Sequence, residues 1–389
     1  MRAAAIAAAA APLLLLRAAS ALLIPSSCSA TASCTAALNA AIASCGASPC
    51  ALQLEAGTYL LEGPEYSARI VLSGSRGLTL TGAGDATVLV SNISQVFQLS
   101  GTSGVTFASF ALEMERLPYT LGQVLSAGAG SSLVQFDATG EYRIELDRHP
   151  WLAHAQGVIT YDPARDRFGT GSDIYALDSP LAINYTRATG TAAQLRIAAE
   201  LIVGQWVVIR HQTYSYNGFS VSRCSDTAWR NVTLWTVAGM GIVTDQCTGI
   251  DIEGLRIAKK PGRPMSITAD GVHFNNPRGG AITIKDSLFE GQGDDGLNAP
   301  TIFQFIVALG SDWFQVGGRG TTGAAAPEFS PGDVVNFFNR SSLLPLGQAA
   351  VAAIGANNTV QLSPPGVPAG VAVFSASSTT RSSTARRSR

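Results

Sequence analysis

Short apolar stretches recur along the chain in the frame φxφxxφxφ, where φ is an apolar or small residue. Leu78–Leu80 begins an earlier, weaker copy, and four copies fit the whole frame: Val105–Leu112, Thr227–Leu234, Ile250–Ile257 and Ile282–Phe289. Repeats of roughly 20–30 residues with strand-like alternation are typical of a β-solenoid. Sandwich strands, the alternative, usually recur every 8–12 residues or so. We therefore predict an all-β chain with a right-handed parallel β-helix whose turns stack on one another.

An amphipathic segment at Thr35–Ala43 predicts a helix that covers the first turn of this solenoid, because a bare apolar end is unfavourable. Two longer stretches, 115–212 and 301–375, interrupt the repeat and are predicted to be inserted antiparallel β-barrels. The cap and first turns then occupy 28–114 and the later turns 213–300. The end of the chain, 376–389, contains only Ser, Thr, Ala and Arg and is predicted to be disordered.

The first 27 residues resemble an export signal. Arg2 precedes an apolar or small run, Ala3–Leu16, of the usual length for a signal core. Cleavage is expected between Ala19 and Ala30, and an N-terminal membrane anchor is the alternative. No other segment is predicted to cross a membrane, so we expect a secreted, extracellular protein.

Composition fits this compartment. The net charge of −1 gives no electrostatic reason to bind nucleic acid or an anionic membrane. The six cysteines are even in number, which in an exported chain predicts disulfides: Cys28, Cys34, Cys45 and Cys50 near the signal, and Cys224 with Cys247. Five sequons permit glycosylation in a eukaryotic host, although each triplet also arises by chance: Asn92, Asn184, Asn231, Asn339 and Asn357.

Two short motifs carry the candidate chemistry, Asp270-Gly-Val-His273 and Asp295-Gly-Leu-Asn298. Their spacing equals one turn of the solenoid, so Asp270 and Asp295 are expected on neighbouring turns about 5 Å apart. Asp294 flanks them. Repulsion between carboxylates should raise the pKa of at least one, which would give an acid beside a base.

Glycoside hydrolysis requires such a pair, because one carboxyl protonates the leaving oxygen while another activates water or attacks the sugar. Two other interpretations stay open at this point. Asp-Gly is a common turn sequence in which Gly adopts a positive φ. Carboxylate clusters on solenoids also bind Ca²⁺.

The stretch from about Val203 to Asn298 resembles the α-1,3-galactosidases of glycoside hydrolase family 110. The resemblance lies in Gly-Met-Gly241 after a Val-Thr-Leu-Trp strand, in the run Arg-Pro-Met-Ser-Ile-Thr-Ala-Asp-Gly-Val-His-Phe, and in Gln-Gly-Asp-Asp-Gly-Leu-Asn. It implies a β-helix with inserted barrels, removal of terminal α-galactose with inversion, no metal or other cofactor, and three essential residues at Asp270, Asp294 and Asp295. This chain departs from the family in having Ala-Pro after Asn298, where His and Gly are usual, and in ending in a Ser/Arg tail.

Polygalacturonases are similar more distantly, with an Asp…Asp-Asp triad at shorter spacing, although their Gly-His-Gly and Arg-Ile-Lys motifs are missing here. By analogy with them, Asp294 is the acid, and Asp270 with Asp295 holds the water. His273 and Asn298 are candidates for binding sugar hydroxyls, and a stacked Asn ladder is the alternative for Asn298.

Arg278 is a further substrate-binding candidate. Arg263 and Arg278 are expected either to close the groove or to be solvated. Trp206 and Trp229 lie in apolar strand patterns that predict core positions.

The hypothesis is a secreted, inverting exo-α-galactosidase whose partner is a glycan with terminal galactose. The alternatives are a Ca²⁺-dependent polysaccharide lyase, a polygalacturonase-like hydrolase and an inactive carbohydrate-binding protein.

Overall fold

The computed structural model describes residues 22–24, 28, 33–46, 48–169, 173–189, 191–300, 303–317 and 327–373. The chain divides into two compact units, 1–300 and 301–389, which are treated separately below. The predicted tail, and the predicted signal except for residues 22–24, lie outside the described residues. Within these described ranges the protein is all-β apart from one α-helix and short 3₁₀ turns.

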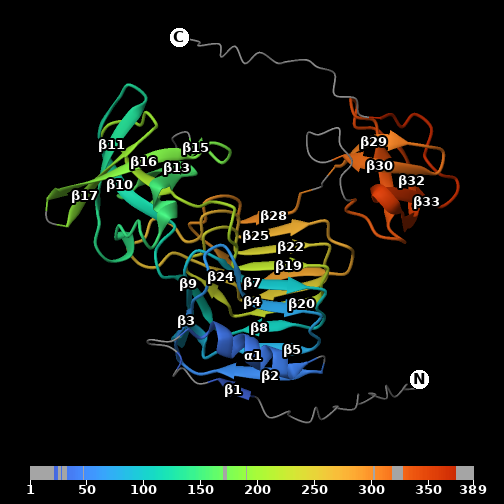
Figure 1. Cartoon of the computed structure of the whole chain (residues 1–389), viewed down its shortest axis with the longest axis horizontal. Helices are drawn as coiled ribbons and strands as arrows, with labels where there is room; N and C mark the ends of the chain where they lie inside the picture. Colours follow the sequence, from blue (N-terminus) through green and yellow to red (C-terminus); the bar gives the residue numbers. More distant parts are fainter. Residues whose placement is uncertain are drawn as a thin grey trace, which may run out of the picture. The chain divides into compact units, whose positions relative to one another are not determined.

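Three parallel sheets form the main body of the first unit (Figure 1), and successive strands enter sheet 1, sheet 2 and sheet 3 in rotation. Sheet 1 contains β1 (Leu22–Ile24), β2 (Cys50–Leu54), β5 (Leu78–Thr81), β8 (Thr106–Ala108), β20 (Ser225–Arg230), β23 (Thr248–Glu253) and β26 (Ile282–Lys285). Sheet 2 contains β3 (Gly57–Leu61), β6 (Thr87–Ser91), β9 (Ala111–Met114), β21 (Thr233–Leu234), β24 (Arg256–Ile257) and β27 (Leu288–Phe289). Sheet 3 contains β4 (Ala68–Ser73), β7 (Gln95–Ser100), β19 (Phe219–Ser222), β22 (Ile242–Asp245), β25 (Val272–Asn275) and β28 (Leu297–Asn298).

The apolar frame found in the sequence corresponds to one strand of sheet 1 followed by one of sheet 2. Thr227 pairs with Ile250, and Ile250 with Ile282, so the copies stack in register despite their unequal spacing. The weak copy at Leu78 is the strand β5, which pairs with β8. The repeat therefore predicted both the parallel pairing and its register.

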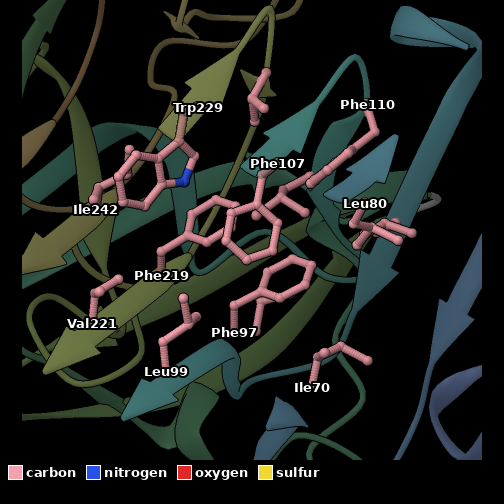
Figure 2. Packing of buried hydrophobic residues seen from close by; sticks show 14 of the residues in the cluster. Ile70, Leu80, Phe97, Leu99, Phe107, Phe110, Phe219, Val221, Trp229 and Ile242 are labelled. Carbon is pink, nitrogen blue, oxygen red and sulfur yellow. The ribbon is translucent and has the colours of Figure 1, made fainter. Parts of the chain in front are cut away.

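Apolar side chains from successive turns meet between the sheets (Figure 2). Phe97 and Phe219, on adjacent strands of sheet 3, stack with ring centroids 4.7 Å apart and planes 6° apart. Trp229 is fully buried and stacks with Phe107 from the neighbouring turn. Its predicted core position is confirmed, whereas Trp206 is only half-buried.

The predicted cap is the helix α1 (Thr35–Cys45), which packs against β4 and β2. Asn39 binds the open edge of β4, because its amide donates to the Arg69 carbonyl (2.7 Å) and its oxygen accepts from the Val71 amide (3.1 Å). Two disulfides bracket the helix, Cys28–Cys34 and Cys45–Cys50. The first cysteine group is thus paired as the even count predicted.

The second cysteine group is different, because Cys224 and Cys247 are free and buried. They lie on successive turns, where the Cys224 amide donates to the Cys247 sulfur (3.3 Å) and Thr102 donates to the Cys224 sulfur (3.1 Å). Both lie at equivalent positions between strands of sheet 3 and sheet 1, where side chains of successive turns point the same way, which does not suit the dihedral of about 90° that a disulfide needs. The disulfides that the even count predicted therefore do not include this second group.

A nine-stranded antiparallel sheet, called the insertion below, lies between β9 and β19 in the chain. Its strands are β10 (Tyr119–Gly128), β11 (Ser131–Asp137), β12 (His154–Ala155), β13 (Gly157–Asp162), β14 (Arg167–Phe168), β15 (Ile174–Tyr175), β16 (Leu181–Thr189), β17 (Ala192–Ile197) and β18 (Trp206–Arg210). A cluster of apolar residues of its own includes Val134, Leu195 and Ile209. The Tyr119 hydroxyl, which donates to the Met265 carbonyl (2.6 Å), ties this sheet to the parallel sheets.

The second unit is a five-stranded antiparallel sheet with its own apolar cluster around Phe314 and Val360. Its strands are β29 (Phe305–Leu309), β30 (Trp313–Gly317), β31 (Val334–Phe338), β32 (Pro345–Ile354) and β33 (Thr359–Leu362). In the described part of the whole chain, no helix is both long and apolar enough to span a bilayer.

Candidate active site

The candidate aspartates lie just before the first residues of strands in sheet 3. On four successive turns a glycine precedes the strand, and the residue before that glycine is in turn Asn217, Met240, Asp270 and Asp295. The Gly241 amide donates to the Asp270 carbonyl (2.9 Å), and the Gly271 amide to the Asp295 carbonyl (2.8 Å). Asp270 and Asp295 therefore occupy equivalent positions on adjacent turns, as their spacing predicted.

These glycines are required because successive repeats of the chain pack closely against each other, and not because the backbone needs a positive φ. Positive φ angles occur at many glycines of the chain, but Gly241, Gly271 and Gly296 are not among them. A Cβ atom at Gly271 would lie 2.3 Å from the Gly296 carbonyl oxygen, and one at Gly241 2.5 Å from that of Gly271. The left-handed turn that was one interpretation of Asp-Gly is therefore not what the structure contains.

Asp270 is the buried member of the cluster, with 2% of its surface exposed. Its Oδ2 atom lies 2.6 Å from Nδ1 of His273 and accepts a hydrogen bond from the Asn298 amide (3.3 Å). Burial raises the pKa of Asp270, the hydrogen bond from His273 lowers it, and the charge of Asp294 raises it further. A raised pKa was predicted, but loss of solvation, not carboxylate repulsion, is its largest cause.

Asp294 is half-buried and held at both oxygens. Oδ2 accepts a hydrogen bond from the Tyr214 hydroxyl, and Oδ1 accepts one from the Asp295 amide (3.0 Å). Burial and the neighbouring carboxylate of Asp294 raise the pKa of Tyr214, so this phenol keeps its proton and acts as a donor. The side chain of Asp295 is exposed. The cluster thus contains one buried, one fixed and one solvated carboxyl.

Arg210, at the end of β18, connects the two aspartate loops. Its fully buried guanidinium donates from Nη1 to the Thr268 carbonyl (3.2 Å), two residues before Asp270, and to the Gly293 carbonyl (3.0 Å), next to Asp294. Its Nε and Nη2 atoms are buried without a partner among the described residues. No motif in the sequence identified this arginine, because the residues that it joins are more than 50 positions away.

The insertion contributes two further groups beside Arg210. The guanidinium lies 4.8 Å from the centroid of the Tyr175 ring, on β15. Loss of solvation raises the pKa of Asp173, Arg210 lowers it, and Asp294 raises it, which places this carboxyl near both residues. Sequence reasoning missed Tyr214, Arg210, Tyr175 and Asp173, since none belongs to a repeated pattern.

Of the predicted binding residues, His273 and Asn298 join the cluster through Asp270. The second ring nitrogen of His273 lies 3.1 Å from the Asn275 oxygen, so both of its nitrogens have protein partners. The structure does not bring Arg278 to the aspartates. It follows the opposite end of β25, where it donates to the Gln246 oxygen (3.1 Å).

Arg263 neither closes a groove nor is solvated, which corrects both expectations for it. It is 5% exposed and donates to Oε1 of Glu113 (3.1 Å) on β9 and, through Nε, to Oε2 of Glu141 (2.9 Å) in the insertion. A buried guanidinium needs such partners, because an unpaired charge there is strongly unfavourable. Arg263 is therefore a structural link between the insertion and sheet 2.

The arrangement is suited to proton transfer. A buried carboxyl of raised pKa lies beside a second carboxyl that is fixed by two donors and open to solvent, which is the asymmetry that acid–base catalysis needs. Among the described side chains, no group of three or more His, Cys, Asp or Glu residues is placed to hold a metal ion.

Comparison with known proteins confirms the resemblance noted in the sequence. The chain is 28% identical over 162 residues to an alpha-1,3-galactosidase B of Akkermansia muciniphila, over 41% of this chain and 20% of the relative. It is 29% identical over 109 residues to an alpha-1,3-galactosidase A of Shewanella woodyi, which covers 28% of this chain and 18% of the relative. It is 22% identical over 316 residues to an alpha-1,3-galactosidase A of Streptomyces avermitilis, which covers 72% of this chain and 48% of the relative. The chain thus spans at most about half the length of these relatives. No family model matches it.

Among solved structures, the chain matches one from Parabacteroides merdae at a TM-score of 0.31 and 10% identity, over 72% of this chain and 96% of that one.

Proposed function

We propose that this protein is a secreted glycoside hydrolase that removes terminal α-1,3-linked galactose from glycans with inversion. Its scaffold is a right-handed parallel β-helix, in which the three parallel sheets form the walls and the two antiparallel sheets are barrel-like insertions. The rotation of strands among the sheets and the right-handedness of nearly all parallel crossovers support this scaffold. The two disulfides fit an oxidising compartment, which supports secretion.

The observation that carries the proposal is the pairing of buried Asp270 with the fixed carboxyl of Asp294 in a chain that resembles α-1,3-galactosidases. Asp294 donates a proton to the glycosidic oxygen as the bond from that oxygen to C1 breaks. A water molecule bonds to C1 from the opposite face and loses its proton to Asp270, with Asp295 as the second holder of the water. The product is β-galactose, and both oxygens of Asp294 are orientated by Tyr214 and the Asp295 amide.

Proton NMR during hydrolysis of an α-1,3-linked galactoside tests this function. Galactose should appear first as the β-anomer, and a chelator should not change the rate. Initial release of the α-anomer would contradict inversion, and absence of galactose release would refute the activity.

The pH profile of kcat/KM is expected to depend on His273. A general base must be ionised, so activity falls as the pH drops through the raised pKa of Asp270. His273→Ala removes the hydrogen bond that lowers this pKa, and the acidic limb should therefore move to higher pH. Val243→Ala, the equivalent position one turn away, is the matched control and should leave the limb in place. A limb that stays in place in His273→Ala would exclude Asp270 as the group that titrates.

A further inference from the structure

A separate pocket lies in the first unit between the insertion and the turns of the parallel sheets. Its volume is about 280 Å³, and it is lined by Tyr66, Pro150, Trp151, His154, Gln156, Pro180, His211 and Gln212. None of the candidate catalytic residues lines it. The pocket combines aromatic and proline surfaces with side-chain amides, which is a surface suited to a molecule with both apolar and hydroxyl-bearing faces.

Two glutamine amides are open to a ligand in this pocket. Gln212 is 9% exposed, and its amide has no hydrogen-bond partner among the described residues. The oxygen of Gln156 accepts from the Thr213 amide (2.8 Å) and hydroxyl (3.0 Å). This orientation leaves the Gln156 nitrogen without an acceptor in the described chain. Among the described residues, neither glutamine has an amide atom that is both fully buried and unpartnered, so both amides keep contact with solvent in the pocket. The hydroxyl groups of a ligand can replace water at such atoms.

Tyr66 forms an aromatic platform at the pocket. Its φ of 67° lies in the left-handed region that a bulky residue rarely adopts, and its side chain is 52% exposed while its ring lies 5.2 Å from that of Tyr216. Backbone strain of this kind persists where the surrounding structure imposes it, often at ligand sites. The strain here holds an aromatic face towards solvent beside the pocket.

The pocket carries no Asp, Glu, Lys or Arg among its lining residues. Burial lowers the pKa of His211 to about 3, so its ring is neutral. An anionic sugar such as a uronic acid would find no Lys or Arg among the lining residues. The pocket therefore fits a neutral ligand that offers hydroxyl groups to the amides and an apolar ring face to Trp151 or Tyr66.

The pocket and the aspartates lie on the same side of sheet 3, at the end where its strands begin. Tyr66 precedes β4 and Asp270 precedes β25, with β7, β19 and β22 between these strands. Four strand spacings correspond to about 19 Å. A glycan of a few sugar units can span this distance along the edge.

We propose that this pocket binds a neutral sugar unit of the same glycan, on the leaving-group side of the cleaved bond and a few units away from it. The inference rests on the proposed hydrolase function and extends it, because the preferred substrate is then a neutral oligosaccharide with terminal galactose and not a short galactoside.

Kinetics of Tyr66→Gly test the pocket. Glycine adopts the φ of residue 66 without strain, so the fold should be retained while the ring is lost. KM for a neutral galactose-terminated pentasaccharide should rise about tenfold, the effect of losing one aromatic contact, whereas kcat/KM for an aryl α-galactoside should not change. Gln212→Ala should give the same pattern. Asn358→Gly, another positive-φ residue replaced by glycine in the second unit, is the matched control.

An unchanged KM for the pentasaccharide in Tyr66→Gly, or an equal rise for both substrates, would overturn the pocket assignment. Saturation-transfer NMR with a neutral tetrasaccharide of alternating galactose and N-acetylglucosamine tests binding without catalysis. Transfer in the wild type that is lost in Tyr66→Gly supports the pocket even if no galactoside is hydrolysed, in which case the proposed function alone fails. No transfer in the wild type refutes the pocket.

Discussion

Asp294→Asn is expected to lower kcat on a natural α-1,3-galactoside by about 10²- to 10⁴-fold, the usual contribution of a positioned general acid. The side chain is half-buried and Asn keeps its shape and can accept from Tyr214, so the melting temperature should stay close to that of the wild type. Steady-state kinetics with thermal unfolding on the same samples measures both effects. Retained activity in this variant would remove Asp294 from the mechanism.

The leaving group distinguishes the acid from the base. Dinitrophenolate leaves a dinitrophenyl galactoside without being protonated, so Asp294→Asn should lose much less activity on this substrate than on the natural one. Asp270→Asn should lose activity on both, because water activation is needed in either case. The reverse pattern would exchange the two roles and make buried Asp270, with its raised pKa, the acid.

Asp286→Asn is the matched control for these variants. Asp286 is exposed on the same turn of the chain and has a φ of 51°, a conformation that asparagine also tolerates well. Its replacement should change neither kcat nor the melting temperature. A loss of activity there would show that carboxylates on this turn act through net charge and not through proton transfer.

The apolar frame that recurs along the chain explains which parts of the fold could be predicted from the sequence. The same positions of the frame recur at each turn, so Thr227, Ile250 and Ile282 stack in register, although Ile282 is exposed whereas Thr227 and Ile250 are buried. The register of Asp270 with Asp295 follows from the same repeat. The glycine before β19, β22, β25 and β28 reflects the same stacking, since a Cβ at Gly271 would meet the next turn. These are local patterns that recur at every turn, and a single sequence contains them.

Contacts between distant segments explain what the sequence did not predict. Arg210 reaches the carbonyls of Thr268 and Gly293 only because the insertion folds back onto the later turns. Tyr214 meets Asp294 from a connecting loop that has no periodic pattern. In the same way, Arg263 was expected at the surface because an isolated arginine in a sequence gives no sign of a partner such as Glu113, 150 positions away.

Arg263→Ala is expected to lower the free energy of unfolding by about 3–5 kcal/mol, the usual cost of removing one partner from a buried ion pair. Glu113, 7% exposed, would keep only Lys260 (2.5 Å) as a cationic partner. Urea unfolding followed by tryptophan fluorescence measures the change. Arg196→Ala, which removes an exposed arginine of the insertion, should cost less than about 1 kcal/mol.

A double-mutant cycle separates the ion pair from simple loss of packing. Removing the charge of Glu113 as well, in Glu113→Gln with Arg263→Ala, should recover part of the lost stability, because no buried carboxylate then depends on the exposed Lys260 alone. Additive losses would instead attribute the effect to packing. Arg263 also binds Glu141 of the insertion, and Arg210 of the same insertion donates to the Thr268 and Gly293 carbonyls beside the aspartates. Arg263→Ala should therefore lower both kcat/KM and stability, whereas Asp294→Asn should lower activity alone. This contrast distinguishes Arg263, which positions the insertion, from Asp294, which transfers the proton.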